Sequence, residues 1–548
     1  MSSTKNYEVI DSMEMVKTIR IHLPNEIGRI TGNIAAILTR KIEERSGARV
    51  INDSLGDFQV YLAVEQGVGP EGYTISDVPD GGIRITGNDE RGLLYGVGKF
   101  LRTSRCCEGG FTPGKWRGSS IPECPVRGIY FAVHFNNFYE AASDAEVERY
   151  LEELALWGLN AVACHFPPQQ FNGLDDPGAK RNIERIRAIF LAAKRIGLQV
   201  GLLEAINIGF KSAPKQIYYT PFPDDLGRRG NLGTLLCPGN PDGRDYLLRQ
   251  WGGLLDEFRD IELDFFESWS YDEGGCGCEK CWPWGKKGFL SISKEVADLF
   301  RSKYPSGRVI LATWMYDTPY AGEWDGLSEY MAEDGSWIDY IMADAHEDFP
   351  RYPLDNPVPG NRPLLNFPEI SMWGILPWGG YGANPLPDRF QRLWNQASHK
   401  LSGGFPYSEG ISEDINKVLC LQFYWEKKRS AEDILREYIS FEASPSVADA
   451  VLEAVRIMES NHHRDKIGES AVHACELMEN ADKVLTMQAR QAWRWRILFL
   501  RALIDHELYK NGGEHRGTVL AKAFNELVEI YHAQEAFDVV RPPAESQQ

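Results

Sequence analysis

The chain has 548 residues, of which 43% are hydrophobic and 25% charged, and this composition excludes collagen-like, low-complexity and wholly disordered proteins. The 59 Lys and Arg against 78 Asp and Glu give a net charge of −19. Because no Lys- or Arg-rich stretch offsets this charge, we do not expect nucleic acid as a partner. No segment approaches the ~18 consecutive apolar residues of a membrane span, so no membrane partner is expected either.

The N-terminal residues and the cysteines bear on the compartment. Residues 1–20 contain neither the apolar core nor the small-residue cleavage site of a secretory signal. Ten Cys in a chain of this length do not make a disulfide framework. Both features predict a cytoplasmic protein.

Residues 1–122 are predicted to form a small α/β domain. Alternation of apolar and polar residues predicts strands at Lys17–Leu23, Asp57–Val64 and Gly82–Thr86. Helical spacing is found over Ile27–Glu44, and a second helix is expected from Asn88, as the N-cap, to Arg102. A Pro-Glu-Cys-Pro segment at 122–125 marks a linker.

Residues 123–429 alternate short apolar runs with amphipathic stretches. Eight such runs occur, at 127–134, 160–166, 199–206, 263–269, 308–316, 338–344, 363–370 and 403–409. Eight strand–helix units over about 300 residues match the size of a (β/α)₈ TIM barrel. A doubly wound sheet is the alternative, which the even spacing disfavours.

Residues 430–548 contain no further strand pattern. Helices are predicted at 431–442, 446–459, 469–484, 488–510 and 518–533. The predicted fold class is therefore α/β: a TIM barrel with an N-terminal small α/β domain and a C-terminal helical domain.

Polar and aromatic residues gather at the carboxyl ends of the predicted barrel strands, where TIM barrels carry their active sites. Carboxylates and His suit the hydroxyls of a neutral sugar, and aromatic rings suit its apolar face. We expect substrate contacts from His134, His165, Glu204, Asn207, Trp314, Tyr316, Asp344, His346, Trp373, Trp378 and Tyr407. No Gly-rich phosphate loop precedes a helix, which disfavours phosphoryl transfer and dinucleotide binding.

The segment after the fourth barrel strand reads Ser270-Tyr271-Asp272-Glu273-Gly274-Gly275. Adjacent strand residues point to opposite faces, so Asp272 and Glu273 can act together only where the chain bends, and the two glycines permit a bend. The sequence Ile85-Thr86-Gly87-Asn88-Asp89-Glu90-Arg91-Gly92-Leu93-Leu94-Tyr95-Gly96 resembles the domain that precedes the barrel in β-N-acetylhexosaminidases and α-glucuronidases. Arg127-Gly128, Leu159-Asn160 with His165, and Asp272-Glu273 also resemble those enzymes.

This resemblance implies a glycoside hydrolase that removes a terminal sugar from a short glycan without a catalytic cofactor. In the hexosaminidase-like version Glu273 is the general acid/base, and Asp272 orients a substrate 2-acetamido group that acts as internal nucleophile. In a glucuronidase-like version, or another exo-glycosidase, Glu369 or Glu409 is a second catalytic carboxylate. Glu409 also has a structural interpretation, as a cap of the helix that begins near Glu413. A catalytically silent carbohydrate-binding protein is the alternative from another class, and the sequence leaves a homodimer open.

Three thiols lie within six residues in Cys276-Gly277-Cys278-Glu279-Lys280-Cys281. With Cys237 as a fourth ligand they would form a closed, structural zinc site beside Asp272-Glu273. Reduced thiols packed in a loop are the alternative. This Cys-x-Cys-x-x-Cys segment resembles one in an endo-β-N-acetylglucosaminidase-like family.

Overall fold

The structure is a computed structural model that describes residues 15–24, 28–52, 56–79, 81–107, 109–134, 137–223, 234–271, 274–316, 322–346, 348–371, 382–463 and 466–532. It divides into two compact units between Ile121 and Pro122. None of the helices that it describes is both long and apolar enough to cross a lipid bilayer.

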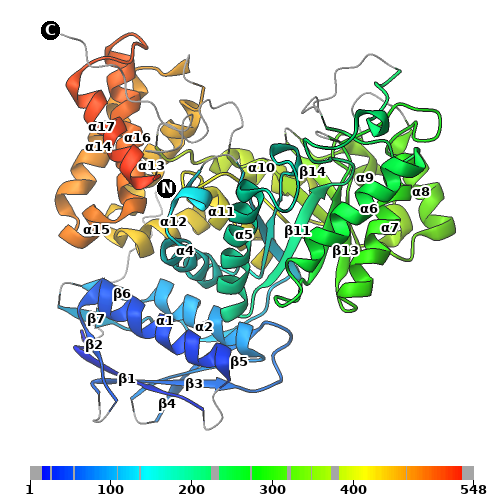
Figure 1. The fold of residues 1–548 in the computed structure, drawn as a ribbon. Coiled ribbons are helices and arrows are strands. Elements are labelled where there is room, and N and C mark those ends of the chain that lie inside the picture. Colours follow the sequence, from blue (N-terminus) through cyan, green and yellow to red (C-terminus); the bar gives the residue numbers. More distant parts are fainter. Residues whose placement is uncertain are drawn as a thin grey trace. The chain divides into compact units, whose positions relative to one another are not determined.

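The first unit is a six-stranded sheet with two helices on one face (Figure 1). The strand order is β2-β1-β3-β5-β4-β8, parallel from β2 to β5 and antiparallel at β4 and β8. The elements are β1 (Thr18–His22), α1 (Arg29–Ser46), β2 (Arg49–Val50), β3 (Phe58–Val64), β4 (Tyr73–Val78), β5 (Gly82–Gly87), α2 (Glu90–Thr103), β8 (Gly118–Ser120) and a separate hairpin of β6 (Arg105–Cys107) and β7 (Gly110–Thr112).

The predicted N-cap of α2 is wrong by one residue. The side chain of Asp89 caps the helix, because its Oδ1 accepts a hydrogen bond from the backbone N–H of Gly92 at 2.8 Å. The amide oxygen of Asn88 instead accepts from the backbone N–H groups of Gly67 and Gly69, at 2.9 and 3.0 Å. Asn88 therefore holds the loop between β3 and β4.

The second unit contains a closed barrel of eight parallel strands, which confirms the predicted TIM barrel. Strand β9 closes the ring by pairing with both β10 and β16, and the short β17 extends its pairing. The eight barrel strands are β9 (Val126–Phe131), β10 (Ala161–Cys164), β11 (Gln199–Ala205), β12 (Phe265–Trp269), β13 (Arg308–Ala312), β14 (Tyr340–Ala345), β15 (Leu364–Pro368) and β16 (Leu401–Gly404), and the short addition is β17 (Tyr407–Ser408).

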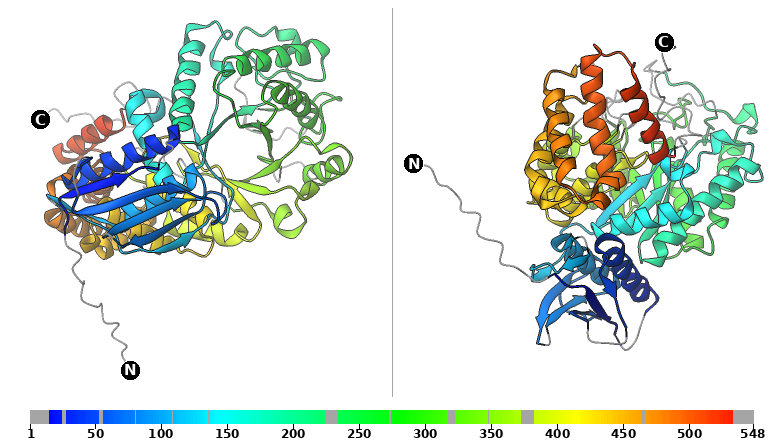
Figure 2. Two further views of the ribbon diagram at one scale, coloured as in Figure 1. Left: turned by 90° about the horizontal axis from the view of Figure 1, so that it is seen from below. Right: turned by 90° about the vertical axis from the view of Figure 1, so that its left-hand side faces the viewer.

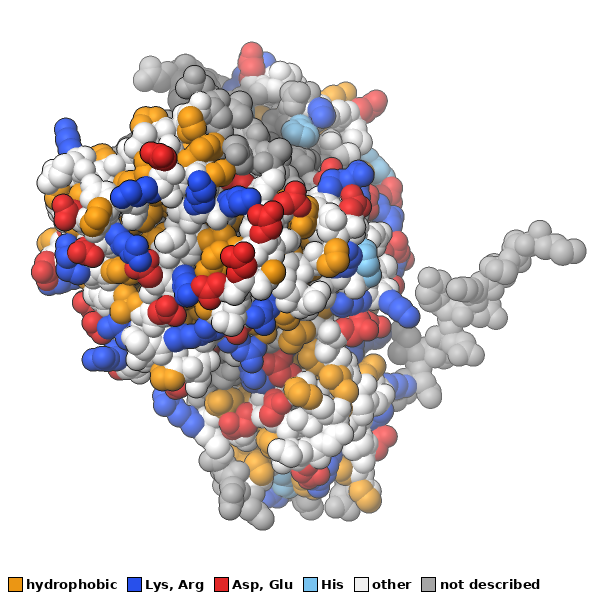
Figure 3. All heavy atoms as spheres, turned by 90° about the vertical axis from the view of Figure 1, so that its right-hand side faces the viewer, with side chains coloured by type: hydrophobic (Ala, Val, Ile, Leu, Met, Phe, Trp, Pro, Cys, Tyr) orange, Lys and Arg blue, Asp and Glu red, His pale blue; other side chains and the backbone are white. Residues whose placement is uncertain are grey.

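Helices follow the strands and lie outside the ring (Figure 1). They are α3 (Phe138–Ala141), α4 (Asp144–Leu156), α5 (Pro177–Arg195), α6 (Pro241–Asp256), α7 (Gly288–Lys303), α8 (Glu323–Asp334), α9 (Arg351–Asp355), α10 (Pro387–Ala397) and α11 (Asp414–Trp425). Ion pairs join neighbouring helices, as Arg244–Glu295 joins α6 to α7 and Lys294–Asp334 joins α7 to α8. Figure 3 accordingly shows basic and acidic side chains intermixed over one face.

The helices from Ala431 onward belong to the same compact unit as the barrel. They are α12 (Ala431–Glu442), α13 (Ala448–Ser460), α14 (Ser470–Val484), α15 (Met487–Gln491), α16 (Trp493–Lys510) and α17 (Thr518–Ile530), and α13, α14, α16 and α17 pack side by side (Figure 2). The predicted single helix 488–510 is wrong, because Ala492 has an extended backbone (φ −63°, ψ 132°) that separates α15 from α16.

Candidate active site

Five aromatic side chains form what we call the aromatic floor, at the carboxyl end of the barrel interior. The floor consists of Tyr130, Trp269, Trp314, Phe367 and Tyr407. Trp269 and Trp314 stack with ring centroids 5.3 Å apart, and Tyr130 stacks on Tyr407 at 5.3 Å. Phe367 lies 4.7 Å from Trp269 and 5.9 Å from Tyr407, so it joins the two pairs. Flat apolar rings at a barrel end suit the apolar face of a sugar.

The predicted contacts His134, His165 and Glu204 lie together. The rings of His134 and His165 are 4.9 Å apart. His165 Nδ1 is 3.0 Å from a carboxylate oxygen of Glu204, whose other oxygen accepts from the backbone N–H of Phe166 at 3.0 Å. Burial lowers the pKa of His134 well below its usual value, and His165 lowers it further. His165 Nδ1 also lies 3.0 Å from the Leu203 carbonyl oxygen, so the backbone of β11 contributes to the orientation of this ring. The contact of all three residues with a ligand stays a prediction.

Asp344 and His346 flank Trp314. A carboxylate oxygen of Asp344 accepts from the backbone N–H of Met315 at 3.3 Å, and the His346 ring lies 6.2 Å from that of Trp314. Met315 has a φ of +63°, a left-handed conformation that is uncommon for a residue with a side chain. Trp314 Nε1 is buried without a hydrogen-bond partner in the described part of the chain. Tyr316 points elsewhere, because its hydroxyl donates to the Gly285 carbonyl at 2.8 Å.

Two predicted catalytic carboxylates, Glu369 and Glu409, follow neighbouring strands of the barrel. Ser371 links them: its backbone N–H donates to Glu369 Oε1 at 2.7 Å, and its hydroxyl accepts from the Glu409 backbone N–H at 2.9 Å. The Tyr407 hydroxyl donates to Glu409 Oε1. Glu409 Oε2 is buried and has no partner among the described residues.

The surroundings of Glu409 favour its neutral form. Burial raises the pKa of Glu409 well above its usual value, Glu369 raises it further, and the hydrogen bond from Tyr407 lowers it in part. The alternative role of Glu409 as a helix cap has no support in these contacts. The residue before α11 is Glu413, and its carboxylate accepts from the backbone N–H groups of Glu409 and Gly410.

Glu267 is a further carboxyl group inside the barrel. It lies on β12 between Phe265 and Trp269, which both face the interior, and it pairs in register with Leu203 and Ile310. Its side chain is fully buried, and neither oxygen has a partner within the described ranges. Burial raises the pKa of Glu267 well above its usual value, which favours the neutral carboxyl.

Asp272 and Glu273 lie outside the described residues, as do Trp373 and Trp378. The residues on either side of the Asp-Glu pair are firmly held. Tyr271 donates its hydroxyl to the buried Glu323, which also accepts from the Gly285 backbone N–H at 3.0 Å. Asn207 Oδ1 accepts from the Gly275 backbone N–H at 2.8 Å, and its amide donates to the Gly275 and Leu236 carbonyls at 2.8 Å each.

These contacts give Asn207 a structural task. Its amide matches both backbone groups of Gly275, whose φ of +137° favours glycine. The bend expected to bring Asp272 and Glu273 together falls on residues outside the described ranges and stays a prediction. The contact of Asn207 with a substrate stays a prediction.

The four predicted metal ligands, Cys237, Cys276, Cys278 and Cys281, come together. Their Sγ atoms all lie within 4.8 Å of one another, with Cys237 at 3.5 Å from Cys278 and 4.0 Å from Cys281. All four are free thiols. Gly239 passes so close that a Cβ there would lie 3.0 Å from Cys281 Sγ, which explains why a residue without a side chain occupies this position. The cluster joins the loop after β11 to the loop after β12.

Sequence reasoning missed several residues that hold the site. Glu413, Ser371 and Lys417 support Glu409, and Glu323 supports Tyr271. In the sequence, Glu413 stands directly before a predicted helix, and this position indicates a helix cap. It does not indicate that the carboxylate accepts hydrogen bonds from the preceding loop.

Comparison with known proteins supports the fold. The sequence matches no family model, and no curated protein sequence matches it. A family GH115 4-O-methyl-α-glucuronidase with specificity for decorated arabinogalactans is similar in structure, with a TM-score of 0.62 and 11% identity over 96% of this chain and 77% of that one. A GH138 enzyme targeting pectin rhamnogalacturonan II has a TM-score of 0.58 and 11% identity, over 94% and 93% of the two chains.

Hexosaminidases are similar as well. The GH20 β-N-acetylhexosaminidase from Streptomyces coelicolor A3(2) has a TM-score of 0.52 and 13% identity, over 82% of this chain and 92% of that enzyme. The fold expected from the resemblance to glucuronidases and hexosaminidases is thus confirmed. The chain has the TIM-barrel fold of glycoside hydrolases.

Proposed function

We propose that this protein is a glycoside hydrolase that removes a terminal, uncharged sugar from a short glycan. The observation that carries the proposal is the set of buried polar atoms around the aromatic floor. Trp314 Nε1, Glu409 Oε2 and both Glu267 oxygens have no partner among the described residues. Buried polar groups are normally hydrogen-bonded, and a sugar supplies hydroxyls to such groups while its apolar face covers the rings.

The charge of the lining supports a neutral sugar over a uronate. The ionisable side chains that the described strand ends contribute are carboxylates and histidines: His134, His165, Asp344, His346, Glu369 and Glu409. Arg389 lies nearby, where its guanidinium donates to the His346 carbonyl. A uronate among these groups would add another negative charge to a poorly solvated site. A neutral Glu409 carboxyl, in contrast, can both donate to and accept from a sugar hydroxyl.

The leading candidate substrate is a β-N-acetylhexosaminide, with Glu273 as proton donor and Asp272 beside the 2-acetamido group. The resemblance supports these roles, as does the anchoring of Tyr271 and Gly275 on either side of the pair. The second candidate uses two protein carboxylates. A neutral Glu409 would donate the proton, and Glu369, whose charged form the Ser371 N–H stabilises, would be nucleophile or base.

A panel of nitrophenyl glycosides with and without the 2-acetamido group tests the proposal. We expect turnover of β-N-acetylhexosaminides and strong inhibition by a thiazoline mimic of the oxazoline, about 10²-fold tighter than substrate or more. Full activity on sugars without an acetamido group, together with weak thiazoline binding, would favour the Glu369–Glu409 mechanism. Sugar binding without turnover on any member would favour a catalytically silent binding protein.

We also propose that the four thiols hold one zinc ion. Four sulfurs at about 2.3 Å from a tetrahedral zinc lie about 3.8 Å apart, and the two Sγ separations of 3.5 and 4.0 Å bracket that value. A disulfide needs about 2.05 Å. Four thiolates leave no open position for water, so this zinc would brace two loops and would not act on substrate.

A further inference from the structure

We propose that Glu413 is a positioning residue: its carboxylate fixes the backbone of the loop that carries Glu409, and it places a negative charge beside Glu409 that Lys417 balances. The inference rests on the proposed function, since it takes Glu409 to contact the sugar.

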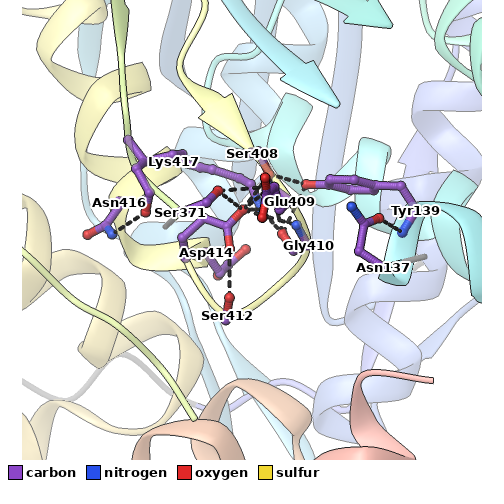
Figure 4. Close-up of polar contacts among 12 residues, drawn as sticks. Asn137, Tyr139, Ser371, Ser408, Glu409, Gly410, Ser412, Asp414, Asn416 and Lys417 are labelled. Atoms are coloured by element: carbon purple, nitrogen blue, oxygen red, sulfur yellow. Dashed lines mark hydrogen bonds and ion pairs between the residues drawn. The ribbon is translucent and has the colours of Figure 1, made fainter. Parts of the chain in front are cut away.

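The hydrogen bonds of Glu413 carry the positioning step. Its Oε1 accepts from the backbone N–H groups of Glu409 at 2.8 Å and Gly410 at 3.1 Å. The same oxygen is 3.0 Å from the Ser371 hydroxyl and 2.6 Å from the Ser408 hydroxyl (Figure 4). Because Ser371 also binds Glu369, one buried carboxylate oxygen sets both the strand end with Glu369 and the loop with Glu409.

Solvent does not reach the carboxylate of Glu413, so water and salt cannot screen its charge. Its side chain and that of Lys417 are both completely buried, and Lys417 Nζ lies 3.7 Å from Glu413 Oε1. The ammonium group donates to the Tyr150 hydroxyl at 2.8 Å and to the Gly410 carbonyl, and it lies over the Tyr139 and Tyr150 rings. In such a poorly solvated environment a fixed charge acts on its neighbours far more strongly than at the surface.

Other groups face Glu409 and Lys417 from the surrounding elements. Glu369 after β15 and Tyr407 of β17 act on Glu409 together with Glu413: burial raises the pKa of Glu409 most, the two carboxylates raise it further, and Tyr407 lowers it. Burial lowers the pKa of Lys417, Glu413 and Asp414 of α11 raise it, and Arg494 of α16 lowers it. Asp414 and Arg494 also form an ion pair with each other at 2.7 Å.

The test is the pH dependence of kcat/KM for a poor leaving group. A neutral Glu409 donates a hydrogen bond to a sugar hydroxyl, so kcat/KM should fall at high pH as Glu409 loses its proton, in addition to any fall caused by Glu273. Glu409→Gln should remove the part of the alkaline limb that belongs to Glu409. Glu413→Gln keeps the shape but removes the negative charge, so Glu409 ionises more readily. We therefore expect its alkaline limb to move to lower pH by about 1 unit. The neutral pair Glu413→Gln/Lys417→Met removes both charges, so its limb should return toward the wild-type position.

Ser408→Ala is the matched control for geometry. It removes a hydroxyl donor to Glu413 without changing a charge, so KM should rise a few-fold while the limb stays in place. Thermal unfolding and circular dichroism will show whether Glu413→Gln folds. If it does not fold, the KM of Ser408→Ala tests the positioning role by itself. An alkaline limb that is the same in wild type, Glu413→Gln and the double variant, or a KM unaffected by Ser408→Ala, would overturn the inference. If Glu409→Gln keeps wild-type activity and its pH profile, the proposed role of Glu409 fails instead.

Discussion

The two sides of the barrel's carboxyl end are held by different chemistry. On the β15–β17 side, the buried carboxylate of Glu413 binds the backbone around Glu409 and is paired with Lys417. On the β12 side, the neutral amide of Asn207 and a cluster of four thiols hold the backbone that follows Asp272 and Glu273. From the proposals above we expect the first side to respond to pH and the second to respond to metal removal, so the two sides can be perturbed separately.

The largest expected effect lies on the β12 side. Glu273→Gln should lower turnover of a substrate with a poor leaving group by at least about 10²-fold, because the leaving oxygen then lacks its proton donor. Steady-state kinetics measure the loss. Glu279→Gln is the matched control, since Glu279 is an exposed carboxylate a few residues further along the same loop. Turnover near wild type for Glu273→Gln would move the acid role to the Glu369–Glu409 side.

Metal removal should destabilise the loop on the β12 side and leave the contacts around Glu409 on the β15–β17 side unchanged. We expect about one zinc per chain in protein prepared without chelators, as measured by elemental analysis. Cys278→Ser should lose the metal, lower the melting temperature by several degrees and reduce turnover by about tenfold or more, because the loop beside Glu273 loses its brace. The pH limb assigned to Glu409 should stay in place.

Cys107→Ser provides the comparison for that experiment. Cys107 is a partly buried free thiol in the first unit, away from the cluster in sequence. Its substitution should change neither metal content nor turnover. Wild-type protein without any metal would contradict the zinc proposal and leave four packed thiols.

Asn207→Ala tests the amide on the β12 side. The substitution removes three buried hydrogen bonds, to both backbone groups of Gly275 and to the Leu236 carbonyl. Each unsatisfied buried group costs about 1–3 kcal/mol, so we expect a lower melting temperature and turnover reduced by about tenfold. Asn172→Ala is a suitable control, because the Asn172 amide binds Asp176 at the surface. Unchanged kinetics in Asn207→Ala would show that the thiols suffice to hold the loop.

The barrel was predictable from the sequence because its strands are short apolar runs separated by amphipathic helices. All eight runs correspond to strands, but the run predicted at 403–409 is divided between β16 and β17. Other runs differ at their ends: those predicted to reach His134 and Phe166 stop at Phe131 and Cys164. In the first unit β2, β4, β6, β7 and β8 were missed, and the longest of these is β4. Its sequence, Tyr-Thr-Ile-Ser-Asp-Val, loses the apolar alternation after Ile75, and pairing with β5 and β8 stabilises it instead.

The cysteine cluster was predictable as well, because three thiols within six residues indicate a metal site that needs one further ligand. The hydrogen bonds that hold Glu409 in place were not predictable. Which backbone groups Glu413 binds depends on how the loop from Tyr407 to Ser412 turns, and that turn is set by contacts with Ser371, over 35 residues earlier in the chain. Residue type and spacing do not encode such a contact. Side chains alternate between the two faces of β11. Because Leu203 and Ala205 face the barrel interior, Glu204 between them points away from it.

The smallest effect is expected from an exposed ion pair near the cysteine cluster, which tests whether surface charge helps to hold the β12 side. Arg244 of α6 lies beside Cys281 in a hollow of about 320 Å³ and forms an ion pair with Glu295 of α7. The side chain of Arg244 is about half exposed, and exposed ion pairs typically contribute less than about 1 kcal/mol because water and salt screen them. Arg244→Gln should therefore keep its zinc and its turnover, with a melting temperature close to wild type. If metal content fell in this variant, the start of α6 would be part of the brace, and the β12 side would depend on charge as the β15–β17 side does.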